Sequence, residues 1–243
     1  MRGAGAVLWH DLECGSYDAD LPLWRELAAA AEGPVLDVGA GTGRVALHLA
    51  RAGHDVTALD SAPELLAALR ERAGDLPVQT AVADARDFSL PGRYGLCVVP
   101  MQTIQLLGAS AGRRAFLRSA RRHLAPGGLL AAALADPLDG FDPATVTDAA
   151  LPLPDMRERG GFVYASQPVA VRPERCATAI ERVRQVIGPS GERSEERDIV
   201  RLERVDPATL AREGIAEGLD PGTPRTVPPT AEHVGSTVVV LRA

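Results

Sequence analysis

The sequence predicts an α/β protein built on a doubly wound, mostly parallel sheet with helices on both faces. Short apolar runs alternate with helical patterns through the first half of the chain. A glycine-rich turn follows the first of these runs and opens a helix, as in strand–turn–helix units. After about residue 135 the pattern changes to strands separated by turns, which predicts an antiparallel strand insertion in the C-terminal half.

The elements of the first half follow from the spacing of apolar residues. We expect a helix within residues 17–32, because Leu23, Trp24 and Leu27 recur at helical spacing and Gly33 can end the helix. Strands and helices then alternate, and the near-continuous apolar strands indicate a parallel sheet buried on both faces. The expected strands span residues 34–38, 55–60, 76–84, 95–99 and 128–134, and the expected helices span 44–53, 63–74 and 111–124.

The second half of the chain follows a different pattern. Segment 136–160 is rich in proline, glycine and aspartate, which favours a loop, and GPSGE at 188–192 is typical of a hairpin turn. The expected strands span 162–171, 176–187, 197–205 and 236–243, and a helix spans 207–218. We therefore divide the chain into an N-terminal helical cap (1–32), a Rossmann-like core (33–135), an antiparallel insertion (136–205) and a last part that completes the core (206–243).

Composition and charge exclude several functions. The 243 residues carry a formal net charge of −6, and all 26 cationic side chains are arginines because the chain contains no lysine. Without lysine, the protein cannot form a Schiff base or carry a GxxxxGK[ST] phosphate loop. There is also no asparagine, so N-glycosylation is excluded. The acidic balance argues against a nucleic-acid partner, which requires a concentrated basic face.

Cysteines, apolar stretches and arginines indicate no further partner. The three cysteines form no CxxC pair, so we expect neither a metal site nor a disulfide framework. No stretch reaches the ~18 apolar residues of a membrane span, and the start lacks a signal pattern, so we expect a cytoplasmic protein without a membrane partner. The densest arginine cluster is predicted to be a solvated helix face: Arg113, Arg114, Arg118, Arg121 and Arg122. The oligomeric state is open.

The glycine-rich turn is the most informative segment. Asp37 lies near the end of the first strand, and Gly39, Gly41 and Gly43 follow it. Without a Cβ atom, the backbone can adopt positive φ, and a ligand can lie directly on main-chain amides at the opening of a helix. An ordinary strand-to-helix turn is the alternative interpretation of this segment.

Two further carboxylates favour a ligand site. Asp60 ends the second strand, where it can accept hydrogen bonds from a ribose diol, and Asp84 ends the third. These aspartates could instead cap helices or form turns. A dinucleotide-binding turn would require a third glycine where Arg44 stands. A cationic nucleoside with an amino acid portion fits better, with Asp37 facing its ammonium group, Asp60 its ribose and Asp84 its adenine amino group.

With these residues, the sequence resembles the class I S-adenosylmethionine (SAM)-dependent methyltransferases of the small-molecule type. The turn DVGAGTG at 37–43 matches the family's [DE]xGxGxG motif, and the resemblance covers residues 33–134. It includes the acid that ends VTALD, the ADA segment at 83–85 and LAPGG before the fifth strand. The resemblance implies SAM as cofactor, bound by residues of the turn and of the strand ends: Asp37, Gly39, Ala40, Gly41, Asp60, Ser61, Asp84 and Ala85.

The resemblance also implies where the acceptor binds. In the family, the end of the fourth strand faces the methyl group and the acceptor, which here places Pro100 against the cofactor and Met101 and Gln102 against the acceptor. The segment departs from the [DN]PP[YF] pattern of nucleic-acid and protein amide or amine methylases, so a small-molecule acceptor is expected. Segment 136–205 would cover that acceptor, and Tyr17 would cap the cofactor.

The chemistry requires few side chains. Because a sulfonium methyl is a strong electrophile, alignment of the reactants alone can supply ~7 to 11 kcal/mol. No catalytic base is assigned. His10 and His233 lie outside the predicted core and are weak candidates, while a surface loop role is expected for each. His48 and His54 are assigned structural roles, and the cationic form of His123 would suit the end of its helix.

The sequence therefore predicts an enzyme that transfers a methyl group from SAM to an oxygen, nitrogen or carbon atom of an unidentified small molecule. Two alternatives remain open: a non-catalytic module that binds SAM, and an NAD(P)-dependent oxidoreductase on a similar sheet.

Overall fold

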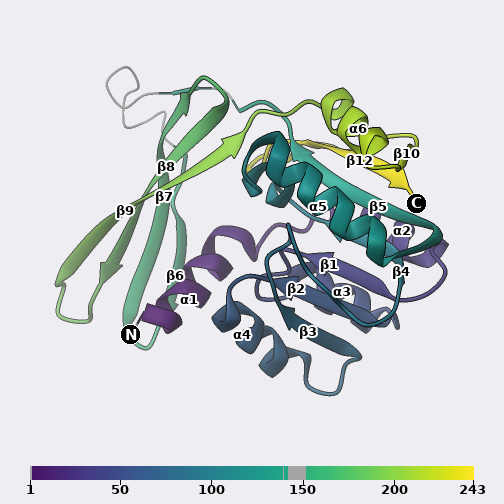
Figure 1. The fold of residues 1–243 in the computed structure, drawn as a ribbon. Coiled ribbons are helices and arrows are strands. Elements are labelled where there is room, and N and C mark those ends of the chain that lie inside the picture. Colours follow the sequence, from purple (N-terminus) through teal and green to yellow (C-terminus); the bar gives the residue numbers. More distant parts are fainter. Residues whose placement is uncertain (1, 139, 142–151) are drawn as a thin grey trace. The chain divides into compact units, whose positions relative to one another are not determined.

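A computed structural model describes residues 2–138, 140–141 and 152–243 (Figure 1). The chain forms two compact units. The first, here called the core unit, comprises Tyr17–Asp136 and Val205–Ala243 together with the start of the first helix. The second, the insertion unit, comprises Leu8–Ser16 and Pro137–Arg204. Among the described residues, no helix is long and apolar enough to cross a membrane.

The core unit is built on a mostly parallel sheet, which confirms the predicted fold class. Its strands are hydrogen-bonded in the order β10–β12–β5–β4–β1–β2–β3, and β11 also pairs with β12. The pairs among β1 to β5 are parallel, whereas β12 runs antiparallel to β5. The strands are β1 (Val35–Val38), β2 (Val56–Asp60), β3 (Val78–Val82), β4 (Tyr94–Val99), β5 (Leu124–Ala135), β10 (Asp220–Pro221), β11 (Arg225–Val227) and β12 (Ser236–Arg242).

Helices cover both faces of this sheet. One hydrophobic cluster contains the fully buried Trp24 and residues of α2, α3 and α4, and the other contains the fully buried Phe116 and residues of α5 and α6. Burying one large apolar side chain contributes about 1.5 to 3 kcal/mol, so both layers add substantially to stability. The helices are α1 (Arg2–Cys14), α2 (Leu21–Ala30), α3 (Arg44–Arg51), α4 (Pro63–Ala73), the 3₁₀ helix η1 (Thr103–Leu106), α5 (Ala109–His123) and α6 (Pro207–Ala216).

Strand alternation determines which face each aspartate occupies. In β1, Val35 belongs to the cluster beneath α2 to α4, whereas Leu36 and Val38 belong to the opposite cluster. Because successive side chains of a strand point to opposite faces, Asp37 shares the face of Val35. The same alternation in β2 places Asp60 on that face, since Ala58 belongs to the same cluster as Val35.

The insertion unit contains an antiparallel sheet with strand order β6–β7–β8–β9. The predicted hairpin turn is present between β8 and β9, where Ile187 pairs with Arg193 and the Gly188 amide donates to Glu192 O at 2.8 Å. The register of β7 shifts between Pro168 and Ala170, because proline has no amide to donate to the ladder. The strands are β6 (Asp155–Arg159), β7 (Phe162–Pro173), β8 (Ala177–Ile187) and β9 (Arg193–Glu203).

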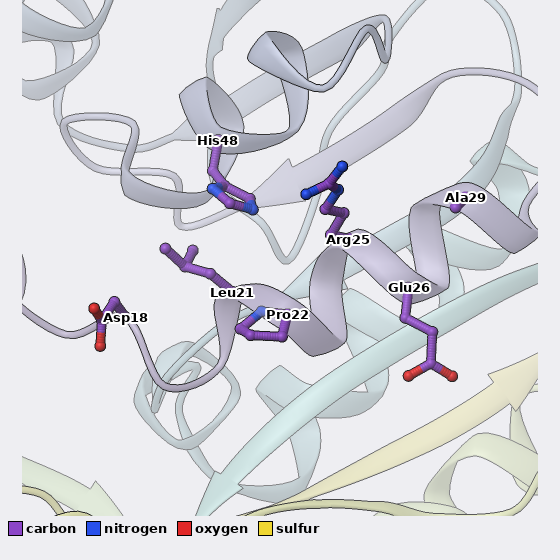
Figure 2. Close-up of a pocket in the computed structure, with 7 residues that line it drawn as sticks. All are labelled: Asp18, Leu21, Pro22, Arg25, Glu26, Ala29 and His48. Atoms are coloured by element: carbon purple, nitrogen blue, oxygen red, sulfur yellow. The ribbon is translucent and has the colours of Figure 1, made fainter.

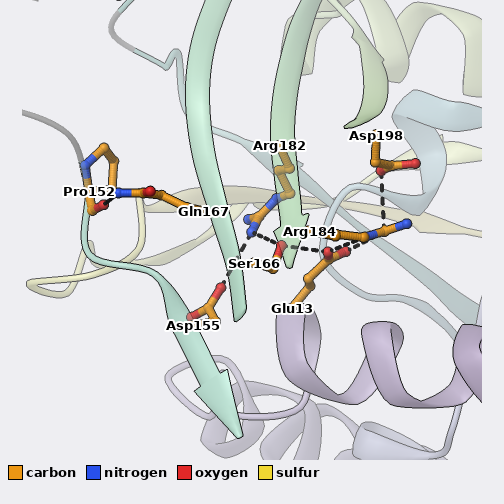
Figure 3. A network of polar contacts seen from close by, with 8 residues as sticks. All are labelled: Glu13, Pro152, Asp155, Ser166, Gln167, Arg182, Arg184 and Asp198. Carbon is orange, nitrogen blue, oxygen red and sulfur yellow. Dashed lines mark hydrogen bonds and ion pairs between the residues drawn. The ribbon is translucent and has the colours of Figure 1, made fainter. Parts of the chain in front are cut away.

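Within the insertion unit, the end of α1 is held on this sheet by buried polar groups (Figure 3). The guanidinium of Arg184 donates to both carboxylate oxygens of Glu13, at 2.7 and 2.8 Å. The hydroxyl of Ser166, itself fully buried, donates to the same carboxylate at 2.7 Å. Such a two-pronged arginine–carboxylate pair fixes orientation as well as charge. Trp9 adds an edge-to-face contact with Tyr164, at 5.8 Å between ring centroids.

Several predicted boundaries are wrong for physical reasons. The loop predicted over 136–160 contains β6, an exposed edge strand of sequence DMRER whose charges conceal the strand pattern; residues 139 and 142–151 of that loop lie outside the described part. The N-terminal helix α1 has no strong helical pattern, and tertiary packing explains its formation better than propensity does. The helix predicted over 17–32 begins only at Leu21.

The predicted solvated arginine face is also partly wrong. Arg113 is buried, and its guanidinium donates to both carboxylate oxygens of Glu213 on α6, at 2.8 and 2.7 Å. Arg114 pairs with Glu217 at 2.7 Å. The Nε2 atom of His123 accepts a hydrogen bond from the Leu90 amide at 3.0 Å, and its Nδ1 atom lies 2.7 Å from the carbonyl oxygen of Ser119. These contacts dock α5 against α6 and against the chain that precedes β4.

Candidate cofactor site of the core unit

The glycine turn between β1 and α3 adopts a backbone that favours glycine. Gly39, Gly41 and Gly43 have φ values of 72°, 53° and 96°, in the left-handed region. The amides of Gly39 and Ala40 both donate to Leu59 O on β2, at 2.8 and 3.1 Å. The turn is therefore tied to the neighbouring strand, and its last glycine caps α3.

The segment after β4 lies directly against this turn. A Cβ atom at Gly39 would come within 2.5 Å of Thr103 Cγ2 and 2.6 Å of its Oγ1. Both the backbone conformation and this close approach require glycine at position 39. The sequence indicates the first requirement, whereas the contact with Thr103 depends on how η1 packs and has no sequence signal.

Asp60 joins the glycine turn to the start of α4. One carboxylate oxygen accepts the Gly41 amide at 2.8 Å, and the other accepts the Ala62 amide at 2.9 Å. Ser61, between them, is exposed. The predicted residues Asp60, Gly41 and Ser61 are thus brought together at the carboxyl end of β2, where parallel sheets bind ligands.

Asp37 is enclosed in the same region but has no partner. Its side chain is fully buried, and within the described part of the chain neither carboxylate oxygen has a hydrogen-bond partner. Burial raises the pKa of Asp37 from its ordinary value of 3.8 to about 7, although the charge of Arg44 acts in the opposite direction. A buried carboxylate without a partner is suited to a cationic ligand group.

Asp84 and Ala85 follow β3, next to the end of β2, since the Ala83 amide donates to Asp60 O at 3.0 Å. The Asp84 side chain is exposed and pairs with Arg86, whose Nη2 lies 2.6 Å from its carboxylate. Hydrogen bonds from Arg86 lower the pKa of Asp84 to about 2. The carboxylate is therefore ionised, and a ligand amino group there would share it with Arg86.

The segment after β4 carries the predicted acceptor-facing residues. Pro100 is buried, whereas Met101 and Gln102 are partly exposed. Met101 has φ of 55°, uncommon for a residue with a side chain and typical of strained backbone at functional sites. The buried side chain of Gln105 accepts the Ala135 amide at 2.9 Å, which ties η1 to the end of β5. No sequence pattern identified Gln105 as the anchor of this segment.

Arg44 holds Tyr17 beside the glycine turn. In the sequence, Arg44 is notable only because it stands where a dinucleotide-binding turn would have its third glycine. Arg44, the first residue of α3, donates to Tyr17 O at 2.9 Å and pairs with the buried Asp20 at 2.5 Å. Its guanidinium carbon lies 5.1 Å from the centroid of the Tyr17 ring. The His233 ring packs on the Tyr17 ring, at 4.9 Å between centroids.

The remaining histidines are placed elsewhere. His10 lies on α1 in the insertion unit, so the surface loop expected for it is wrong. His48 lies on α3 and faces α2, where it lines a groove of about 520 Å³ together with Arg25 and Leu21 (Figure 2). Burial lowers the pKa of His48, with Arg25 adding to the effect. Within the described residues, no three histidine, cysteine or acidic side chains are grouped to hold a metal ion.

A known protein family matches the part of the chain that contains the glycine turn and the parallel strands. Residues 35–128 match a family described as a methyltransferase domain. The chain is 32% identical over 137 residues to a cypemycin N-terminal methyltransferase from Streptomyces sp., a match that covers 54% of this chain and 56% of that protein. The chain therefore aligns with little more than half the length of this curated relative.

Solved structures resemble the chain over nearly its whole length. A SAM-bound amino pentose methyltransferase, CalS10 from Micromonospora echinaspora, is 25% identical and covers 100% of this chain and 94% of its own, with a TM-score of 0.66. A glycopeptide N-methyltransferase, MtfA, in complex with S-adenosylhomocysteine is also 25% identical, covering 91% of this chain and 86% of its own, with a TM-score of 0.59.

Proposed function

We propose that this chain, whose residues 35–128 form a class I SAM-dependent methyltransferase domain, transfers a methyl group from SAM to an amine nitrogen of a small molecule or short peptide. The observation that carries the proposal is the edge formed by β1 and β2, where the buried Asp37 and the amide-bound Asp60 lie on either side of a positive-φ glycine turn. At this edge, the glycine backbone leaves room for a ligand, and the two carboxylates suit a cationic nucleoside.

The assignment to nitrogen rests on the relatives. The curated relative acts on a peptide N-terminus, and the solved structures include an amino pentose methyltransferase and a glycopeptide N-methyltransferase. The first acts at an N-terminus, the second on an amino sugar and the third at nitrogen. A neutral amine needs no base to attack a methyl group, so transfer to nitrogen does not require a catalytic acid–base pair.

SAM, when bound, supplies a methyl group that is activated by the adjacent sulfonium. The residues of this chain then have to bind and orient it. Asp60 would exchange its contact with the Gly41 amide for the ribose hydroxyls. Ala40 and Gly41 would line the amino acid portion of the cofactor. Ser61 and Ala85 would lie on the two sides of the adenine, with Asp84 at its amino group.

Tyr17 would cover the reacting groups, and His233 would accept a proton from them. Because Arg44 holds the backbone of Tyr17 beside the turn, the Tyr17 ring can cap the cofactor. His233, packed on that ring, is the candidate that would accept the amine proton after transfer. Met101 and Gln102 would contact the acceptor.

The proposal is tested with SAM labelled in its methyl group. Purified protein is incubated with amino sugars and short peptides that have a free α-amino group, and with the N-acetylated form of each compound as a matched control. Mass spectrometry should detect one added methyl group on free amines alone. Methylation of the acetylated controls would place the transfer on oxygen or carbon. Failure of folded protein to bind SAM in calorimetry would overturn the activity itself.

A further inference from the structure

The carboxylate of Asp37 is the most unusual polar group of the core unit. It is fully buried at the end of β1, and within the described residues both of its oxygens have no hydrogen-bond partner. Taking an ionised carboxylate out of water without a partner is so unfavourable that such groups usually become protonated instead. The free protein therefore needs a reason to keep an aspartate, rather than an asparagine, at this position.

Among the described residues, no charged side chain forms a pair with Asp37. The charged or titratable groups around it are Arg44 on α3, Asp60 on β2, Asp20 before α2 and the thiol of Cys97 on β4. The guanidinium of Arg44 is directed at Asp20, with hydrogen bonds of 2.5 and 2.8 Å. Asp60 is a like charge, and burial raises the pKa of Cys97, which keeps its thiol neutral.

The balance of these effects favours the protonated form. Burial, followed by repulsion from Asp60 and Asp20, raises the pKa of Asp37 to about 7. The charge of Arg44 opposes this rise, as does the Ala46 amide, which is close to the carboxylate but does not have the geometry of a hydrogen bond to it. A cation that arrived next to the carboxylate would reverse this balance, since an opposite charge within about 4 to 6 Å favours ionisation.

We propose that Asp37 is protonated in the free protein and ionises when the ammonium group of the cofactor binds, so that it selects nucleosides with that ammonium group and couples their binding to release of one proton. This inference rests on the proposed function. In the step, the carboxyl O–H bond breaks, the proton passes to solvent, and the resulting carboxylate pairs with the ammonium, whose own protons are retained.

The coupling is measured by calorimetric titration with S-adenosylhomocysteine, which carries the ammonium group but no reactive methyl. Titrations at pH 6.0 in phosphate and in Bis-Tris, which differ in ionisation enthalpy, give the number of protons released. We expect a value close to one. Affinity should rise about tenfold per pH unit below the Asp37 pKa and become constant above pH 8.

Two controls isolate Asp37. Methylthioadenosine lacks the ammonium group and should bind without proton release, a comparison that needs no variant. Asp37→Asn should bind S-adenosylhomocysteine with an affinity that does not change between pH 5.5 and pH 8, and without proton release.

The outcomes distinguish this inference from the proposed function. Binding of S-adenosylhomocysteine by the wild-type protein without proton release would overturn the coupling and leave the methyltransferase proposal intact. Equal proton release by Asp37→Asn would assign the proton to another group and would also overturn it. Failure of folded protein to bind either nucleoside would overturn both.

Discussion

Three aspartates lie at or near the carboxyl ends of neighbouring strands of the core unit, yet each carboxylate has a different electrostatic environment. Asp37 is buried and has no hydrogen-bond partner in the part of the chain that the structure describes. Asp60 accepts hydrogen bonds from two backbone amides, and Asp84 is exposed in an ion pair with Arg86. At the residue scale, these differences mean that each of the three carboxylates would contribute to ligand binding in a different way. The Asp60 carboxylate is held in place by two backbone amides before a ligand binds. Asp37 requires a cation beside it in order to be ionised, and Asp84 already has the Arg86 cation as its partner.

Replacing Asp60 tests the preorganised carboxylate. Asp60→Ala removes the acceptor for a ribose diol and also the bond to the Gly41 amide. Binding of S-adenosylhomocysteine should weaken by about 1 to 3 kcal/mol, roughly 5- to 150-fold in the dissociation constant. Calorimetry measures this change. Asp75→Ala, at an exposed aspartate of the same unit, serves as the control, and equal affinities of the two variants would exclude the assigned role of Asp60.

The buried carboxylate should also limit stability. The folded-state pKa of Asp37 is raised from 3.8 to about 7, so the folded state holds its proton more tightly than the unfolded state does. This contribution to stability is complete below about pH 4 and is lost as pH rises to about 7.

Asp37→Asn mimics the protonated form at every pH. The variant should unfold at the same urea concentration as the wild-type protein near pH 4 and at a higher one at pH 8. The gain at pH 8 should be at most about 4 kcal/mol, from 1.36 kcal/mol per pKa unit. A variant less stable than the wild-type protein at pH 8 would show that Asp37 is ionised and favourably solvated in the folded state.

Identities of site residues could be predicted from the sequence, but their states could not. The spacing of Asp37 and Asp60 relative to the glycines follows directly from the strand-and-turn pattern. Whether each carboxylate is paired depends on side chains from distant segments, such as the arginine at position 44 that binds Asp20 instead of Asp37. No periodicity in the sequence encodes that choice.

At the scale of elements, one ion pair connects the start of α2 to the start of α3. Asp20 is 2% exposed and accepts hydrogen bonds from Arg44 and from the Trp24 indole at 2.8 Å. It therefore serves two helices at once. Loss of this single carboxylate would leave the Arg44 charge partly buried beside the glycine turn and release the backbone of Tyr17.

Asp20→Ala should lower the free energy of unfolding by about 3 to 5 kcal/mol, because removal of one partner leaves a buried charge uncompensated. Glu26→Ala is the matched control on the same helix, since its pair with Arg225 is exposed and should contribute about 0 to 1 kcal/mol. Urea denaturation of both variants measures the difference. Similar losses in the two would mean that solvent reaches Asp20 and screens its charge.

Elements with strong periodic patterns were predicted well, and elements formed by context were not. The parallel strands and their helices have continuous apolar runs, so their existence follows from local sequence. The edge strand β6 and the helix α1 lack such patterns. Glu13 on α1 meets Arg184, a partner 171 residues away, and only the folded chain brings the two together.

At the scale of the whole molecule, ion pairs with arginine should make stability depend on acidity. Hydrogen bonds from arginine lower the pKa values of Glu26, Asp84 and Glu181. A lowered folded-state pKa contributes stability above the unfolded-state value and loses it as pH falls. We expect thermal unfolding temperatures to drop progressively as pH falls from about 4.5 toward 2, the range between ordinary glutamate and Asp84. Circular dichroism measures this; a constant unfolding temperature down to pH 2 would contradict it.

The architecture of the whole chain could be predicted further than its chemistry. Alternating strands and helices, followed by antiparallel strands, define the mixed architecture that is observed. The acceptor atom could not be predicted, because methyl transfer depends on alignment and leaves no required catalytic residue in the sequence. The assignment to nitrogen comes from the relatives rather than from any side chain.

The close approach of Thr103 to Gly39 has a consequence for how the two substrates affect each other. The segment that would receive the acceptor and the turn that would hold the nucleoside share one van der Waals surface, so neither can shift without displacing the other. An acceptor that strengthens nucleoside binding by some factor must itself bind more tightly, by the same factor, once the nucleoside is present. Binding of one substrate would thereby affect binding of the other through the packing of Thr103 on Gly39.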